Sequence, residues 1–390
     1  MTHTILEAAM QKSQRRTLGL MSGTSADGLD IAYCDVVTKA GSLRNLASET
    51  IEYPAILREK VLGIARSGSV ALGELIALSQ FLGQFYADAI EKFCDKRKIS
   101  KSEFELVGLH GQTAAHLAQP LPYLDRTVRG TLQIGEAEVI AKRFGVVTVS
   151  DFRNGDIAAG GSGAPLAPIY HRAIFARNDA TNVVVNIGGI ANITILKGRD
   201  ECLATDTGPG NCLIDTVIGE RAKLRFDRDG ELAQKGKIDR SLVQRMLKAE
   251  IQQRQLPVSH DRGEILRLLN DEAIAGELDK LSTESALATL GELTVAAIKQ
   301  AYEKMSGAAK PESVIVCGGG AHNGFLVERL KYYFSGSKVE TTGAFGMDVD
   351  FVEAEAFAYL ANLTLDGEPG NMPQVTGASR AAVLGKISLP

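Results

Sequence analysis

The chain has 390 residues, 45% of them hydrophobic and 23% charged, and its formal net charge at pH 7 is −4. This length exceeds the size to which one hydrophobic core usually grows, so the composition predicts a globular protein of two domains. The sequence contains neither the unbroken apolar run of a membrane span nor a long basic run, which argues against membrane insertion and against binding of nucleic acid.

The N-terminal segment and the cysteines bear on the location of the protein. Residues 1–16 (MTHTILEAAMQKSQRR) lack the apolar core of a signal peptide, and their basic residues follow the apolar ones. We therefore expect an N-terminal extension, frayed or helical. The five cysteines are widely separated, odd in number and without a CxxC pair, so we expect buried thiols in a reducing cytoplasm rather than disulfides or zinc ligands.

The first half of the chain has the pattern of an α/β domain. Three apolar segments at its start predict strands, at residues 17–21, 31–37 and 44–53. Helical periodicity follows at residues 55–66 and 72–96. Two further short apolar runs predict strands, namely residues 106–110, which lead into HGQT, and residues 146–149, which lead into SDFRNGD.

The second half repeats this order. Residues 181–196 (TNVVVNIGGIANITIL) again read as strand, small-residue turn and strand, followed by CLATDTGPGN and a helix from residue 212. After a polar stretch to about residue 279, the pattern predicts helices at 284–304, 324–334 and 351–365, and strands at 314–317 and 338–341. Two halves that both open with a glycine-rich hairpin suggest an internal duplication. The expected division is an extension at residues 1–16 and domains at residues 17–175 and 176–390.

Three turns of small residues follow predicted strands and have the composition of ligand-binding loops: residues 22–30, 206–211 and 318–323. Glycines let backbone N–H groups approach an anion, hydroxyls donate to it, and carboxylates bind the divalent cation that neutralises it. The sequence contains no GxxxxGK[ST] motif, and CGGGAHNG fails the dinucleotide-binding pattern at its third glycine. Each turn alone could be structural, but together they favour a cleft between two duplicated halves that binds phosphates.

Motifs along nearly the whole chain resemble those of one family. They are MSGTSADGLD, HGQT, TLQIGE, DFRNGDIAAGGSGAPLAP, NIGGIANIT, DTGPGN, VCGGGAHN, EAEAFAYLA and VTGAS. In this order they resemble the anhydro-N-acetylmuramic acid kinase family of the sugar kinase, heat-shock ATPase and actin superfamily. The resemblance implies two duplicated ribonuclease H-like α/β domains of the actin-like ATPase fold, with a nucleotide cleft between them. It also implies a cytoplasmic enzyme of cell-wall recycling that converts 1,6-anhydro-N-acetylmuramic acid, ATP and water to N-acetylmuramic acid 6-phosphate and ADP.

The expected catalytic residues lie in DFRNGD. In an anhydro sugar, oxygen 6 is bonded to carbon 1, so water must attack carbon 1 before oxygen 6 can take the phosphoryl group, and a carboxylate is the expected base. By the resemblance Asp156 aligns with the family's catalytic base, and it is preferred to Asp151, for which a bond to the turn backbone is the structural alternative. Arg153 is expected either to hold substrate or phosphate oxygens or to orient Asp156 through a salt bridge.

The expected cofactors are ATP and Mg²⁺, because phosphoryl transfer depends on positioning and charge neutralisation. The resemblance aligns three groups of residues with the nucleotide: Gly23, Thr24, Ser25, Ala26, Asp27, Gly28, Leu29 and Asp30; Asp206, Gly208, Gly210 and Asn211; and, beside the adenosine, Gly318, Gly319 and Gly320. Asp27 is the expected magnesium ligand, directly or through water. Glu353 is a second candidate, although a glutamate on a helix is more often simply solvated.

The sugar is expected to contact His110 and Gln112 of HGQT and the backbone at Gly161. A lone histidine is more often structural, and the glycine-rich segment at 160–165 could also simply precede a helix. One position departs from the family pattern, because Val258 stands in a loop where relatives carry a lysine. This departure leaves the exact sugar preference open.

Three other functions compete with this prediction. A kinase for another 1,6-anhydro sugar such as levoglucosan is the nearest alternative. A nucleotide-dependent regulator would need a DNA-reading segment, and no basic helix-turn-helix pattern is visible. A glycosidase would want two catalytic carboxylates and would leave the three turns unexplained. The expected partners are therefore a small sugar and ATP, with no nucleic acid and no membrane, and a homodimer stays open.

Overall fold

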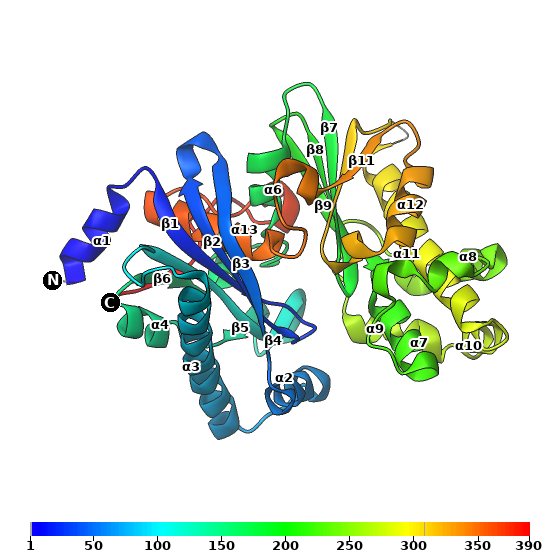
Figure 1. The fold of residues 1–390 in the computed structure, drawn as a ribbon, viewed down its shortest axis with the longest axis horizontal. Helices are drawn as coiled ribbons and strands as arrows, with labels where there is room; N and C mark the ends of the chain where they lie inside the picture. Colours follow the sequence, from blue (N-terminus) through cyan, green and yellow to red (C-terminus); the bar gives the residue numbers. More distant parts are fainter. Residues whose placement is uncertain (1, 308) are drawn as a thin grey trace. The chain divides into compact units, whose positions relative to one another are not determined.

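The computed structural model describes residues 2–307 and 309–390, which form two compact units (Figure 1). Unit 1 contains the chain up to Ile174 together with Phe351–Pro390, and unit 2 contains Phe175–Asp350. The first boundary lies beside the expected one at 175/176. The last segment differs from the expected division, because residues 351–390 belong to unit 1 and not to the second domain.

Unit 1 is built on a seven-stranded mixed sheet (Figure 1). Its strands are β1 (Arg15–Ser22), β2 (Gly28–Val37), β3 (Ser42–Glu52), β4 (Leu106–Tyr123), β5 (Arg126–Ile134), β6 (Val147–Ser150) and β12 (Lys386–Ser388). The main order is β12-β6-β4-β1-β2-β3, and β5 pairs with β4. β1, β4 and β6 are parallel neighbours, whereas β2, β3, β5 and β12 pair antiparallel.

The helices of this part of the chain are α1 (Thr2–Met10), α2 (Ala55–Ser67), α3 (Leu72–Arg97), α4 (Ala137–Phe144), α5 (Phe152–Ala158), α6 (Pro168–Phe175), α13 (Val352–Asp366) and α14 (Pro373–Thr376). Alternate residues of β1 face opposite sides of the sheet. Leu18 and Leu20 belong to the hydrophobic core that includes α3. Gly19, which lies between them, faces the backbone of α13.

Two strand glycines explain why α13 packs in unit 1. A Cβ on Gly19 would lie less than 3.0 Å from the carbonyl of Ala354, and one on Gly108 would lie as close to the carbonyl of Phe357. Glycine within a strand often marks such a close approach of another backbone. The nearly all-buried helix α13 therefore covers the face of the sheet that β1 and β4 open with glycine.

Unit 2 is built on a five-stranded sheet of order β11-β10-β7-β8-β9. Its strands are β7 (Thr181–Ile187), β8 (Ile190–Lys197), β9 (Glu201–Pro209), β10 (Ser313–Cys317) and β11 (Lys338–Thr341). Its helices are α7 (Cys212–Ala222), α8 (Arg240–Leu247), α9 (Arg262–Leu266), α10 (Glu272–Leu278), α11 (Thr283–Ser306) and α12 (Gly324–Tyr333). The helix α11 is buried along most of its length in the core of this unit.

Both sheets contain the same arrangement of five strands. In unit 1, β3, β2 and β1 are antiparallel neighbours, and β4 and β6 follow parallel to β1. In unit 2, β9, β8 and β7 are antiparallel neighbours, and β10 and β11 follow parallel to β7. The predicted fold class of two duplicated α/β domains is therefore confirmed.

Two further expectations can be compared with the structure. All five cysteines are buried, as predicted. Within residues 2–307 and 309–390, no helix has the length and apolar character needed to cross a membrane.

Candidate active site

Three polar segments lie at one edge of the sheet of unit 1. They are the turn after β1, residues 110–112 within β4, and the segment after β6. Because β1, β4 and β6 are parallel neighbours, residues at their carboxyl ends lie at the same edge, which is where ligands bind in open α/β sheets. Ser22, at the end of β1, is directly in register with Gln112.

Gln112 stabilises the turn between β1 and β2 through two hydrogen bonds. Its Oε1 accepts a hydrogen bond from the Ser22 hydroxyl at 2.6 Å, and its Nε2 donates to the carbonyl of Gly23 at 3.2 Å. The Ser22 hydroxyl also lies 2.7 Å from that of Tyr53. Since Gln112 is only 1% exposed, these contacts place it beneath the turn and not on a sugar-accessible surface.

The predicted phosphate turn divides into accessible and buried positions. Gly23, Ser25 and Asp27 are partly exposed and Thr24 is exposed, whereas Ala26, Gly28 and Leu29 are buried. The carboxylate of Asp30 accepts a hydrogen bond from Thr50 at 2.6 Å within the sheet. The accessible face of the turn is therefore Gly23, Thr24, Ser25 and Asp27.

Asp27 has a cationic neighbour. Its Oδ1 lies 3.0 Å from a guanidinium nitrogen of Arg58 on α2, and both side chains are about two-fifths exposed, at 39% and 43%. An exposed ion pair of this kind is weak. A metal ion at Asp27 would have to share the carboxylate with Arg58 or displace that arginine.

Asp156, the expected base, is fully buried within α5. Its Oδ1 accepts hydrogen bonds from the Asn371 amide and the Thr376 hydroxyl, each at 2.7 Å. Its Oδ2 accepts one from the backbone N–H of Gly163 at 2.8 Å. A Cβ on Gly161 would lie less than 3.0 Å from this carboxylate, so Gly161 packs against Asp156.

Arg153 is the second residue of α5, and its protein contacts are with His110 and the backbone of Gly163. Its Nε donates to Nε2 of His110 at 3.0 Å, and its NH1 group donates to the carbonyl of Gly163 at 2.9 Å. It therefore orients Asp156 only indirectly, through residue Gly163: the carbonyl of Gly163 accepts from Arg153, and the N–H of Gly163 donates to Asp156. The predicted direct salt bridge is not formed.

His110 is a neutral acceptor in this arrangement. Burial, with the neighbouring charge of Arg153 as a smaller cause, lowers the pKa of His110 well below its usual range. The ring packs 4.6 Å from that of Phe357 on α13, measured between centroids. An unprotonated Nε2 can accept the hydrogen bond that Nε of Arg153 donates.

Asp151 has a structural environment. Its Oδ1 accepts from the side chain of Asn154 at 2.7 Å, and its Oδ2 lies 2.6 Å from the ammonium of Lys386. These partners are side chains, whereas the sequence suggested a bond to the turn backbone. Both oxygens of Asp151 therefore contact side chains of the protein, one of them a lysine ammonium, which gives this carboxylate a structural role.

Glu353 lies in the first turn of α13 and is exposed. Its charge interacts with that of Arg153. An exposed carboxylate at this place can approach a ligand.

The glycine turns of unit 2 converge on the turn between β7 and β8. The backbone N–H of Asn211 donates to the carbonyl of Gly188 at 2.8 Å, and a Cβ on Gly210 would lie less than 3.0 Å from that same carbonyl. A Cβ on Gly318 or on Gly320 would collide with Ile187 or its carbonyl. The sequence separately predicted two of these turns as nucleotide-binding, and the structure brings them together around a third.

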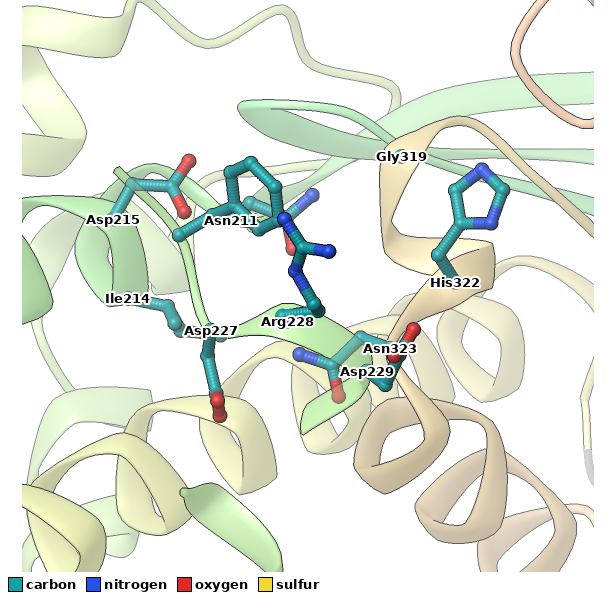
Figure 2. A pocket seen from close by; sticks show the side chains of 10 residues that line it. Asn211, Ile214, Asp215, Asp227, Arg228, Asp229, Gly319, His322 and Asn323 are labelled. Atoms are coloured by element: carbon teal, nitrogen blue, oxygen red, sulfur yellow. The ribbon is translucent and has the colours of Figure 1, made fainter. Parts of the chain in front are cut away.

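A pocket of about 530 Å³ opens beside these turns (Figure 2). Its lining comes from α7, from the segment after α7 and from the glycine turn after β10: Asn211, Ile214, Asp215, Phe226, Asp227, Arg228, Asp229, Gly319, His322 and Asn323. This volume is typical of sites for small molecules. Asp227 has a structural role, because its carboxylate accepts the N–H groups of Leu232 and Ala233, both at 3.0 Å.

Asp206 and Gly208 contact a neighbouring loop and do not line that pocket. Burial raises the pKa of Asp206 to about 6, although the N–H of His260 donates to its Oδ2 at 2.8 Å. A Cβ on Gly208 would collide with the side chain of Gln252. The loop at Val258 is held by its backbone, which bonds to the N–H of Asp206 and to the hydroxyl of Thr205, so the valine itself is not needed to place it.

Sequence reasoning missed four residues of these sites. Asn371 and Thr376 bind the Asp156 carboxylate from a segment 215 and 220 residues away, and VTGAS, which contains Thr376, was the only signal for them. Phe226 and Arg228 lie in a polar stretch with no motif, and only their place in the fold brings them to the pocket.

The sequence was compared with family models, curated proteins and solved structures, and nearly the whole chain matches one family. A family model described as anhydro-N-acetylmuramic acid kinase matches residues 15–390. Two curated proteins of that description are similar to this chain. The one from Vibrio vulnificus strain CMCP6 is 37% identical over 375 residues, which cover 95% of this chain and 97% of the relative. The one from Shewanella baltica strain OS185 is 40% identical over 372 residues, which cover 94% of this chain and 97% of the relative. A similar solved structure is the activator of the 2-hydroxyisocaproyl-CoA dehydratase from Clostridium difficile with bound ADPNP, 13% identical with a TM-score of 0.46 and covering 90% of this chain and 95% of that chain.

Proposed function

Because this chain belongs to the anhydro-N-acetylmuramic acid kinase family, we propose roles for its residues in the reaction of that family. The protein is an ATP-dependent kinase of 1,6-anhydro-N-acetylmuramic acid in peptidoglycan recycling. Its substrate has no free hydroxyl at carbon 6, since oxygen 6 is part of the anhydro bridge. Transfer of the γ-phosphoryl group to oxygen 6 therefore requires that water opens the bridge at carbon 1.

We propose that Asp156 is the base that takes a proton from this water. The observation that carries the proposal is its carboxylate, buried at the carboxyl edge of the sheet and oriented by three hydrogen-bond donors. A base held in this way loses little energy in reorienting when the reaction occurs. As water attacks carbon 1, its proton passes to Asp156, the bond from carbon 1 to oxygen 6 breaks, and oxygen 6 attacks the γ-phosphorus.

The Asp156 carboxylate is fully buried, and the segment at 160–163 packs against it through Gly161 and Gly163, so we propose that water reaches the carboxylate after this segment moves. Three of these four residues are glycine, which adopts new backbone angles at little cost. We propose that sugar binding displaces this segment. The pair of Arg153 and neutral His110, which lies beside it, is proposed to contact sugar oxygens.

Each unit has turns that are proposed to bind part of a nucleotide. The adenosine occupies the pocket lined by Phe226, Arg228 and Gly319, where an aromatic ring and a guanidinium offer faces for stacking. The exposed backbone and hydroxyls of Gly23, Thr24 and Ser25 bind phosphate oxygens.

The residues present fit a magnesium ion held mainly by phosphate and water. Among the residues that the structure describes, no three His, Cys, Asp or Glu side chains lie together as a metal cage. Magnesium in kinases needs only one or two carboxylates besides the phosphates, and the exposed carboxylates of Asp27 and Glu353 are the proposed contributors. Such an ion would neutralise the phosphate charge during transfer.

A cytoplasmic location and association into a homodimer also remain predictions.

Consumption of ATP in the presence of two sugars tests the substrate. We expect turnover with 1,6-anhydro-N-acetylmuramic acid and much less with levoglucosan, which lacks the acetamido and lactyl groups. Mass spectrometry of the product should show one added water and one added phosphoryl group. Equal turnover of the two sugars would favour the broader anhydro-sugar kinase.

A further inference from the structure

We propose that Thr376 and Asn371 are positioning residues that occupy Oδ1 of Asp156 and so assign Oδ2 as the atom that accepts the proton from water. The inference rests on the proposed role of Asp156 as the base. It adds which oxygen reacts and which side chains determine this.

The two carboxylate oxygens have different numbers of donors. Each has room for about two hydrogen bonds. Oδ1 has both, from Asn371 and Thr376 at 2.7 Å, whereas Oδ2 has one, from the N–H of Gly163 at 2.8 Å. One acceptor direction therefore remains, and it belongs to Oδ2.

The residue beside Oδ2 is the smallest available. Of the carboxylate atoms, Oδ2 is the one that a Cβ on Gly161 would approach most closely. Any side chain at position 161 would fill the space next to the remaining acceptor direction. Glycine at this place lets the backbone of residue 161 pack directly against Oδ2.

The Asn371 amide is held in one orientation. Its Oδ1 accepts the N–H of Ala382 at 2.7 Å, so the amide nitrogen must face Asp156, where it donates to the carboxylate and also approaches the carbonyl of Arg380 at 3.3 Å. An amide fixed on both sides can only donate to Asp156. It cannot rotate to repel the carboxylate.

Thr376 connects the carboxylate to the covering segment. The Thr376 hydroxyl donates to Oδ1 of Asp156. The Thr376 carbonyl accepts two hydrogen bonds from Ser162, one from its N–H at 2.9 Å and one from its hydroxyl at 3.0 Å. A single residue thus holds both the base and the segment that covers it. The groups that bind the carboxylate are all neutral. The charged neighbours are Arg153, which contacts the Gly163 carbonyl, and Glu353, which interacts with Arg153.

The decisive variant is Thr376→Val, which keeps the side-chain shape and removes the donor. Loss of a hydrogen bond to a charged group should lower kcat about tenfold to a hundredfold without a matching rise of KM for either substrate. The acid limb of the pH profile of kcat should move to higher pH, because a carboxylate with one donor fewer binds a proton more readily. Thr376→Ser, which keeps the hydroxyl, should retain most of kcat and the wild-type profile.

Two further variants separate positioning from folding. Thr364→Val is the matched control, since this hydroxyl donates to the carbonyl of Leu384 at 2.7 Å, away from Asp156, and its loss should leave kcat unchanged. Asn371→Leu removes the other donor to Oδ1 and should lower kcat in the same way as Thr376→Val. Circular dichroism and thermal melting establish that each variant is folded.

The variants distinguish an error in the positioning proposal from an error in the proposed role of Asp156 as the base. If Asp156→Asn is inactive but Thr376→Val and Asn371→Leu keep the wild-type kcat and pH profile, the positioning proposal falls and the base remains. If Thr376→Val is unfolded, or if Thr376→Ser and Thr364→Val lose as much activity, the hydroxyl serves the fold and the proposal is likewise overturned. If Asp156→Asn retains full activity, the role of the carboxylate itself is wrong.

Discussion

At the scale of single residues, the proposed chemistry depends on how one carboxylate is held. Two aspartates flank Arg153 in the DFRNGD motif, and the structure gives them different partners. Asp151 is paired with Lys386 and Asn154, while Asp156 is buried among neutral donors. A carboxylate whose partners are all neutral is the better candidate to take a proton from water, because no ammonium group opposes its protonation.

Replacement of Asp156 by asparagine is the first prediction at this scale. The amide is nearly isosteric, so ATP and sugar should still bind, but turnover of the anhydro sugar should fall at least a hundredfold to about ten-thousandfold, the usual contribution of a general base. Calorimetry measures binding, and a coupled assay measures turnover. If a sugar with oxygen 6 already free is an acceptor, it needs no water at carbon 1, so the variant should be impaired less on that sugar. Equal losses on both sugars would assign Asp156 to the phosphoryl acceptor instead.

Buried His171 on α6 predicts a pH dependence of stability. Burial lowers its pKa from 6.5 to about 4, so between these values the unfolded chain binds the proton and the folded chain does not. Its contribution is therefore unfavourable at low pH, and stability falls as the pH drops below 6.5. Between pH 7 and pH 5 the wild type should lose about 2 kcal/mol more of its unfolding free energy than His171→Gln. Urea titrations at the two pH values measure this difference, and parallel losses in both proteins would contradict it.

At the scale of helices and strands, close packing at glycine determines which sheet a helix covers. Helix α13 was expected in the second domain, yet it packs on β1 and β4, where Gly19 and Gly108 admit its backbone. A helical period indicates that a segment is a helix with a buried face, but not which sheet buries it. Here the complementary signal lay in two glycines more than 200 residues earlier in the chain.

Gly108→Ala tests this packing. The added methyl would meet the carbonyl of Phe357, so the sheet or α13 must shift, and overpacking of this kind costs about 1 to 3 kcal/mol. Gly130→Ala is the control, since Gly130 also lies in a strand, β5, but has open space where its Cβ would be. Chemical denaturation should show a loss for Gly108→Ala and little change for Gly130→Ala. Similar stabilities for the two variants would refute the close-packing explanation.

Long regular elements were predictable from the sequence, and short ones were not. The strands of both hairpins and the long helices α3 and α11 agree with their hydrophobic periodicity. The hairpin of β4 and β5 was missed because its strands are largely exposed and lack a strong apolar pattern. The helices α8, α9 and α10 were read as polar stretch because they have only five to eight residues each. Within the site, the role of Gln112 was also not predictable from the sequence. Its residue type and motif suggested a contact with the sugar, whereas its hydrogen bonds stabilise the turn after β1.

At the scale of the whole molecule, the same strand order occurs twice with different side chains at the carboxyl edge. Unit 1 presents hydroxyls, Arg153, His110 and Asp156, whereas unit 2 presents glycine turns and a pocket with an aromatic side chain. We infer that the duplicated units divide the work, with sugar chemistry in the first and recognition of the nucleotide base in the second.

Phe226→Ala tests this division. Phe226 is 49% exposed at the pocket, so its removal should leave the fold intact and remove a stacking surface. The KM for ATP should rise about tenfold, as expected when an aromatic–base contact is lost, while the KM for the sugar stays the same. Tyr332→Ala, which removes an exposed aromatic outside the pocket, should change neither. A rise in the KM for the sugar alone would contradict the division.

In the proposed mechanism, water opens the sugar at carbon 1 with Asp156 as its base, and turnover in oxygen-18 water shows where the oxygen of that water goes. Turnover of 1,6-anhydro-N-acetylmuramic acid in labelled water should give product with one labelled oxygen, located on carbon 1, and none in the phosphate, read by mass spectrometry immediately after the reaction. Label enters at the same rate as ATP is consumed in the wild type, and both rates should fall together in Asp156→Asn. Label in the phosphate group, or unlabelled carbon 1 in freshly formed product, would rule out attack of water at carbon 1.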